Sequence, residues 1–261
     1  MDIIRRKWLT ALCGAGAGLV LVGCELKSAR DEDEEKSEKA GKENAGTEVT
    51  ATEDLMREHG VLRRCLLVYQ ETVTKLRSNA TVPPDALQKT ATLFRSFGEE
   101  YHETKLEETY IFPAVQKAGG LAAAYLGVLN AQHQRGREIT NYIISATRSG
   151  KLGNAPEFAG ALEAFARMYE HHAAVEDTII FPAWKQTMTK DQREKISDDF
   201  AEIEQKQFGK DGYEDAVKRI ADVEASLGLA DLGQFTAPPP PAAKESKVPP
   251  EKSGKEKTQN K

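Results

Sequence analysis

Apolar residues recur at intervals of three and four between about residues 51 and 230, which is the spacing of one face of an α-helix. The stretch from Glu53 to Arg77 is typical, and its regularly spaced apolar residues are Leu55, Met56, Leu62, Leu66, Val73 and Leu76. No segment sustains the alternation of apolar and polar residues that a half-buried strand requires. The pattern therefore predicts an all-α protein.

Proline, glycine and capping residues divide this pattern into separate helices. They predict four long helices, at about 53–77, 84–117, 121–149 and 155–188, and two shorter ones at about 191–208 and 213–227. Either Thr50 or Thr52 provides the N-cap of the first helix, and Asn154 provides that of the fourth. We therefore expect an antiparallel, up-down four-helix bundle with a C-terminal helical extension.

The N-terminal segment has the composition of a secretion signal. A basic run, Arg5-Arg6-Lys7, precedes an apolar run shorter than the roughly 20 residues that span a bilayer. The sequence Leu21-Val22-Gly23-Cys24 resembles the bacterial lipobox, which implies cleavage before Cys24 and attachment of lipid to that cysteine. In the lipoprotein pattern, glutamate rather than aspartate after the cysteine, here Glu25, permits sorting to the outer membrane. The alternative is an ordinary signal peptide with an incidental cysteine.

The chain thus divides into a lipoprotein signal peptide (1–23), an acidic disordered tether (24–50), a helical bundle (51–235) and a disordered tail rich in proline and lysine (236–261). The expected location is the bacterial cell envelope, with the lipid anchor in the outer membrane and the bundle facing the periplasm. Charged residues make up 30% of the chain and the net charge is -5, which argues against a nucleic-acid partner. Cys65 is alone in the bundle, which excludes an internal disulfide there.

All five histidines of the chain lie on the four predicted long helices. They are His59, His102, His133, His171 and His172. On the second and fourth helices a histidine precedes the same sequence, Glu-x-x-x-Ile-Phe-Pro, which begins at Glu107 and again at Glu176. Imidazole and carboxylate ligands without thiolate suit iron, manganese or zinc, and six or seven such groups exceed what one zinc ion needs. The pattern predicts one metal centre shared by four helices.

The ordered set of these motifs resembles the hemerythrin-like, or HHE cation-binding, family. The resemblance includes the segments 55–62 and 132–137 and both Glu-x-x-x-Ile-Phe-Pro segments, and it extends from about residue 53 to 235. It implies a carboxylate-bridged centre of two iron ions. The implied ligands are His59, His102, Glu107, His133, His172 and Glu176, with the two glutamates as bridges.

Two positions depart from a regular pattern. His102 and Glu107 are five residues apart, so a regular α-helix would splay them, whereas His172 and Glu176 are four apart and share a face. Either a π-bulge near Thr104 absorbs the extra residue, or Glu103 replaces His102 as the ligand. Arg137 stands where oxygen-carrying hemerythrins have a further histidine, which argues against simple oxygen carriage.

Other polar residues near the predicted ligands have open roles. Glu108 and Asp177 either orient ligating histidines or face solvent, and His171 is either such an orienting residue or exposed. The expected function is that of a lipid-anchored di-iron protein that binds or reacts with dioxygen, peroxide or nitric oxide. The alternatives are an enzyme of the peroxidase or ferroxidase type, an iron storage or sensing module, and a structural lipoprotein without metal.

Overall fold

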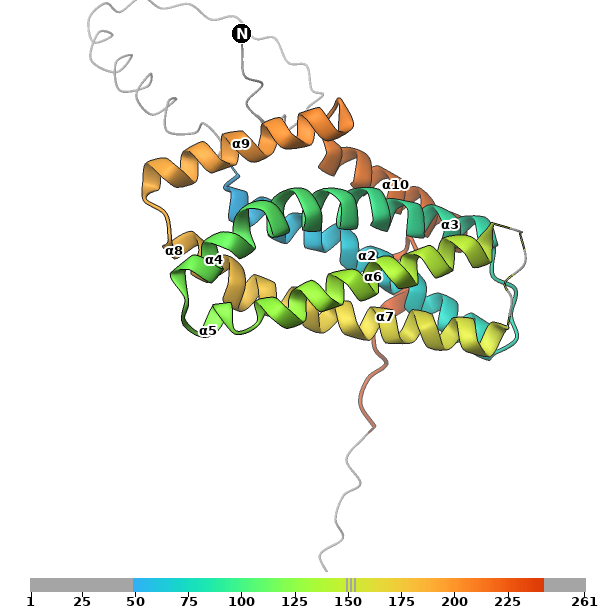
Figure 1. Cartoon of the computed structure of the whole chain (residues 1–261). Coiled ribbons are helices and arrows are strands. Elements are labelled where there is room, and N and C mark those ends of the chain that lie inside the picture. The colour runs from blue at the N-terminus through green and yellow to red at the C-terminus, as the bar shows by residue number, and fades with distance from the viewer. Residues whose placement is uncertain (1–48, 149, 151, 153, 242–261) are drawn as a thin grey trace, which may run out of the picture.

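The computed structural model describes residues 49–148, 150, 152 and 154–241. The predicted signal peptide, the lipidation site at Cys24, nearly all of the tether and most of the tail lie outside the described residues. Within the described part of the chain every regular element is a helix, which confirms the all-α fold class. The four long helices run side by side as a bundle (Figure 1).

Each long helix has a composition that explains its ends. The first, α2, spans Ala51–Arg77, and Thr50 and Glu53 form a reciprocal capping box at its start. The second begins with α3 (Pro84–Leu93), continues as η1 (Phe94–Ile111) and ends with α4 (Phe112–Ala118). Gly119 ends it with φ 74°, a backbone conformation that suits glycine and few other residues.

The third and fourth helices differ in detail from the expected ones. The third is broken at Ala124–Tyr125 into α5 (Gly120–Ala123) and α6 (Leu126–Thr147). The fourth comprises α7 (Ala155–Val175), η2 (Glu176–Ile180) and α8 (Phe181–Gln186). Asn154 occupies the N-cap position of α7, but its side chain makes no capping hydrogen bond. The predicted N-cap position is therefore confirmed, but the capping hydrogen bond of its side chain is not.

The segments η1 and η2 are π-helices, in which each backbone N–H bonds to the carbonyl five residues earlier. In η1 the hydroxyls of Thr104 and Thr109 donate hydrogen bonds to carbonyls five residues back, both at 2.6 Å. Each π segment is followed within two residues by a proline, Pro113 or Pro182, where an α-helix resumes. The expected single bulge near Thr104 is thus an 18-residue π-helix.

The bundle core is apolar at one end and charged in its middle. Phe94, Phe165 and Tyr169 form a cluster of ring contacts between the second and fourth helices, with centroids 4.8–5.1 Å apart. Removing a buried ring of this kind costs about 3–5 kcal/mol of stability. Cys65 is fully buried, and burial raises the pKa of its thiol to about 12, so it acts as a small apolar residue.

Two further helices cover one side of the bundle. The helix α9 (Lys190–Phe208) contacts α2 and η1, and α10 (Gly212–Leu227) contacts α2 and α3 (Figure 1). A short 3₁₀ turn, η3 (Leu232–Phe235), follows. Among the described residues, no helix combines the length and the apolar character needed to cross a bilayer.

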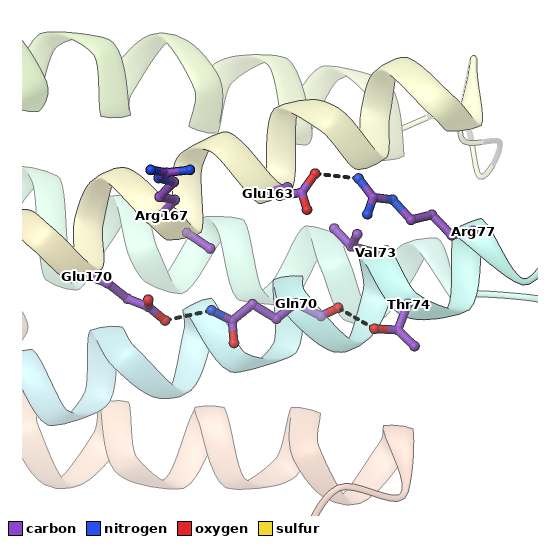
Figure 2. Close-up of a pocket in the computed structure, with 8 residues that line it drawn as sticks. Gln70, Val73, Thr74, Arg77, Glu163, Arg167 and Glu170 are labelled. Carbon is purple, nitrogen blue, oxygen red and sulfur yellow. Dashed lines mark hydrogen bonds and ion pairs between the residues drawn. The ribbon is translucent and has the colours of Figure 1, made fainter.

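A surface pocket of about 310 Å³ lies between α2 and α7 (Figure 2). Six of its eight lining residues have polar side chains. Two contacts between the helices cross it: an ion pair between Arg77 and Glu163, and a hydrogen bond from Gln70 to Glu170 at 2.6 Å. None of the predicted metal ligands lines it. The chemistry expected from the sequence therefore has to be sought inside the bundle.

Candidate metal centre

Four of the five histidines meet in pairs at the centre of the bundle. The Nε2 atoms of His59 on α2 and His102 on η1 lie 3.0 Å apart, and we call this pair the first half of the centre. The Nε2 atoms of His133 on α6 and His172 on α7 lie 3.1 Å apart, and this pair is the second half. All four side chains are buried, with at most 3% of their surface exposed.

Two glutamates lie between the halves, and each contacts both. The carboxylate of Glu107 is 3.4 Å from Nε2 of His102 and 3.3 Å from Nε2 of His133. The carboxylate of Glu176 is 3.5 Å from Nε2 of His59 and 3.1 Å from Nε2 of His172. A carboxylate that contacts one histidine of each pair is placed as a bridge between two ions would be.

The outer nitrogen of every one of these rings is occupied. Nδ1 of His59 bonds to Asp177 at 2.7 Å and Nδ1 of His102 to Glu58 at 2.7 Å. Nδ1 of His133 bonds to Glu108 at 2.8 Å and Nδ1 of His172 to the amide oxygen of Gln132 at 2.9 Å. These oxygens accept hydrogen bonds, so each Nδ1 carries the proton, and Nε2 of a neutral ring turns a lone pair toward the centre.

This arrangement fits a pair of metal ions. Two lone pairs that face each other at 3.0–3.1 Å repel unless a proton or a cation lies between them. Metal–imidazole bonds of about 2.1 Å at a right angle place two nitrogen atoms about 3.0 Å apart. All four carboxylate oxygens of Glu107 and Glu176 are buried without a hydrogen-bond partner, which a structural role would not leave so. Histidine nitrogen and carboxylate oxygen suit iron, manganese or zinc.

In the metal-free protein, protons on the histidines balance the negative charge of the buried carboxylates. Burial lowers the pKa of His102, but Glu107 and Glu58 outweigh burial and raise that pKa well above its ordinary value. Burial likewise raises the pKa of Glu107, but His102 and His133 outweigh it and hold that pKa well below its ordinary value. The site is therefore built to hold positive charge between its two carboxylates.

Aromatic rings close both ends of the centre. Phe181 stacks on the ring of His59 and Phe112 on the ring of His133, each with centroids 5.4 Å apart. Both phenylalanines belong to the repeated Ile-Phe-Pro sequence and are buried. They wall the centre from water and fix the planes of the two rings.

The π-helix η1 removes the spacing problem between His102 and Glu107. Because a π-helix repeats its hydrogen bonds every five residues, side chains five positions apart lie about one turn apart. Nε2 of His102 and Oε1 of Glu107 accordingly meet at 3.4 Å. On α7 and η2 the pair His172 and Glu176 meets at 3.1 Å with four-residue spacing.

Glu103, the alternative ligand on the second helix, lies beside the second half of the centre. It accepts hydrogen bonds from the hydroxyl of Tyr169 and from Nη2 of Arg137, the latter at 3.1 Å. Gly136 leaves room for the Tyr169 ring, since a Cβ there would lie 3.0 Å from it. Burial raises the pKa of Glu103 to about 8. Because both carboxylate oxygens of Glu103 accept these hydrogen bonds, His102 rather than Glu103 is the candidate ligand next to Glu107.

Of the remaining candidates, Glu108 and Asp177 hold histidine rings and His171 is exposed. Sequence reasoning missed Glu58, Gln132 and Tyr169. A signal for the first two exists in the sequence, because each directly precedes a histidine of the centre and bonds to the histidine of a neighbouring helix. Glu108 and Asp177, in the same way, directly follow Glu107 and Glu176.

The fold and the site together define a helical bundle that holds a buried histidine and carboxylate cluster. The hemerythrin HHE cation-binding domain family matches residues 50–184, and the chain belongs to this family. Relatives include the uncharacterized protein Mb2018 of Mycobacterium bovis and the uncharacterized protein Rv1995 of Mycobacterium tuberculosis. Each is 42% identical over 191 residues, which cover 72% of this chain and 74% of the relative. No solved structure matches the chain significantly.

Proposed function

We propose that this chain is a di-iron protein that binds or reacts with dioxygen, peroxide or nitric oxide. The observation that carries the proposal is the convergence of four histidine Nε2 atoms on four buried, unpaired carboxylate oxygens. His59 and His102 would hold one ion, His133 and His172 the other, and Glu107 and Glu176 would bridge them. When bound, a pair of iron ions supplies redox equivalents and open positions for a small ligand.

The residues of the chain prepare the site for that ligand. Phe112 and Phe181 exclude water from the ends of the centre, and the outer hydrogen bonds fix each histidine in one tautomer. A buried site that excludes water strengthens the electrostatic interactions within it.

An enzymatic role is the second candidate, and a specific feature favours it. Arg137 stands where oxygen-carrying hemerythrins have a further histidine, and each half of the centre has two imidazoles. Fewer imidazoles leave more positions open for a reacting ligand. The buried acid Glu103, with a pKa of about 8, and the hydroxyl of Tyr169 lie next to the second half and can carry hydrogen bonds to a reacting ligand.

Two assays separate these candidates after iron loading. Visible spectroscopy that records reversible changes on cycles of oxygenation and deoxygenation would support carriage. Loss of the spectrum with multiple turnovers of peroxide would support an enzyme. Glu176→Ala is the site variant and the exposed Glu170→Ala its control, since both lie on the fourth helix. An iron-free protein, or iron retained by Glu176→Ala, contradicts the proposal.

We further propose that the chain is lipid-anchored at Cys24 in the outer membrane, with its bundle in the periplasm. The support is the sequence alone: the basic and apolar runs before Cys24 and the glutamate that follows it. Globomycin-sensitive processing and metabolic labelling with a fatty acid would test it. A Cys24→Ser variant that is still labelled would contradict it.

A further inference from the structure

The described residues contain two groups of buried side-chain oxygens without a hydrogen-bond partner. One group is the four oxygens of Glu107 and Glu176 in the metal centre. The other consists of the hydroxyl of Tyr69, Oε1 of Glu99 and the hydroxyl of Thr140. Leaving such atoms unpaired is costly, so a second group of them outside the metal centre requires an explanation.

These three side chains come from different helices and are all buried in the bundle. Tyr69 lies on α2, Glu99 on η1 and Thr140 on α6, and each is at most 2% exposed. Burial raises the pKa of Glu99 and of Tyr69; the nearby hydroxyl of Thr140 partly offsets the rise for Glu99, and the charge of Glu99 adds to the rise for Tyr69. The three oxygen atoms nevertheless have no hydrogen-bond partner of good geometry, and a bridging water would supply one.

Glu99 connects this space with the surface. Its Oε1 is buried without a hydrogen-bond partner, while its Oε2 lies 3.7 Å from Nε of Arg95, whose side chain is 28% exposed. Burial raises the pKa of Glu99, and Glu100 on the same helix adds to this, whereas Arg95 and, from α6, Arg137 lower it. The carboxyl thus stands between solvent and the interior in a setting that favours its protonated form.

The same helix leads from Glu99 to the metal centre. Glu103 is four residues further along η1 and is also buried. An oxygen of Glu103 lies within 4.8 Å of a ring nitrogen of His133. The long π-helix therefore carries three buried glutamates at every fourth position, 99, 103 and 107, of which the first contacts Arg95 and the last belongs to the candidate metal centre.

We propose that Tyr69, Glu99 and Thr140 bind an internal water molecule, and that Glu99 passes protons through it between solvent and the metal centre. Three polar partners are the usual number for a buried water. Reduction of one hydrogen peroxide to two water molecules by two iron(II) ions consumes two protons and leaves two iron(III) ions. Glu99 gives up its proton toward the centre and is reprotonated from solvent at Arg95.

The water-binding part of this proposal can be tested without metal. In the full chain, Thr140→Val and Tyr69→Phe each remove one partner of the water, and each should lower the melting temperature by about 2–4 °C. The double variant should lose less than the sum, because both changes expel the same water. A rise in melting temperature for either variant, or additive losses, would show that the space is dry and would overturn the proposal.

A matched control uses Thr147, which is buried on the same helix but bonds to the carbonyl of Ile143 at 2.8 Å. Thr147→Val should combine additively with Tyr69→Phe, since the two share no partner. Coupling in this pair as strong as in the first pair would mean that the coupling arises from general packing, and the water site would be rejected.

The proton-transfer part rests on the proposed function, and its test is Glu99→Gln in the iron(II)-loaded full chain. This variant keeps the shape and the contact with Arg95 but has no acidic proton. Oxidation of the iron by peroxide should slow at least about tenfold, with unchanged iron content and with loss of one infrared band of a protonated carboxyl group. Glu170→Gln, at an exposed position of α7, should leave both unchanged.

The outcomes separate this proposal from the proposed function. An unchanged rate in Glu99→Gln with normal iron content overturns the proton route alone. A wild-type chain that binds no iron overturns the proposed function, while the water site is still decided by the melting temperatures of the metal-free variants.

Discussion

The two halves of the metal centre have nearly the same geometry but differ in charge. In each half one histidine bonds to an acid that also pairs with an arginine: Asp177 with Arg63, and Glu108 with Arg137. The other histidine differs, because His102 bonds to the carboxylate of Glu58 and His172 to the amide of Gln132.

This difference has a chemical consequence. A carboxylate that accepts the Nδ1 proton makes the ring a stronger base than an amide does. We therefore expect the first half to hold its ion more tightly, and the second half to hold a weaker-bound ion that is more open to an added ligand. Arg137 and Glu103 lie beside the second half as well, so the chemistry is expected there.

The largest effect is expected from removing a bridge, which breaks both halves at once. Glu107→Ala and Glu176→Ala should each abolish metal binding, because each carboxylate contacts a histidine of both halves. The loss of bound metal should cost about 3–4 kcal/mol of stability at metal concentrations 100 to 1,000 times the dissociation constant. Elemental analysis and thermal unfolding measure this, with the exposed Glu100→Ala as control. Retention of one ion by either variant would mean that the carboxylate serves one half alone.

Exchanging the residue types at Glu58 and Gln132 should reverse which half of the centre binds its metal ion more tightly. Glu58→Gln should weaken the first half by about 10- to 100-fold, and Gln132→Glu should strengthen the second. Metal competition titrations resolve the two binding steps. If both variants leave the two steps unchanged, the charge of the outer partner does not set the difference between the halves.

The stability of the metal-free protein should depend on pH in the opposite way to that of the loaded protein. Burial lowers the pKa of His59, but Asp177 and Glu176 outweigh it, and His102 and His133 are raised as well. Stability from these charged histidines is complete below about pH 6.5 and is lost as pH rises through their folded pKa values.

At lower pH the carboxylates set the limit. Burial raises the pKa values of Glu107 and Glu176, but the neighbouring histidines lower both below the ordinary value, so their contribution is lost as pH falls below about 4.5. Metal-free protein should therefore melt highest at about pH 5–6. Loaded protein should gain stability from pH 5 to 7, because ligating histidines must be deprotonated. Parallel pH curves for the two forms would contradict a shared site.

The smallest effect is expected at His171, which belongs to neither half. His171 neighbours the candidate ligand His172 in sequence but is exposed. His171→Ala should keep the full metal content and change stability by no more than about 0.5 kcal/mol. Loss of one metal ion in this variant would mean that His171 binds metal and that the ligand assignment on the fourth helix is wrong.

The sequence predicts the long helices and the candidate ligands, but it does not predict every break in the helices. Apolar periodicity and the breaks at Pro84 and Gly119 predict the long helices, because these are local properties of the chain. The break at Ala124–Tyr125 carries no glycine or proline and was not predicted. The repeated motif indicates four of the six candidate ligands, and the segments around His59 and His133 that resemble the family indicate the other two; the structure brings all six together.

The length of the π-helix and the outer partners could not be predicted in the same way. A five-residue spacing between His102 and Glu107 indicates a local irregularity, but the hydrogen-bond shift over 18 residues depends on packing against the other helices. Glu58, Gln132 and Tyr169 act across helices, so their roles require knowledge of which helices are neighbours.

The iron content of the purified chain tests the central claim most directly. Elemental analysis of protein loaded with iron and freed of unbound metal should give about two iron ions per chain, bound in two distinguishable steps. A chain that binds no iron, or one that takes up a single zinc ion in its place, would contradict a centre of two bridged halves.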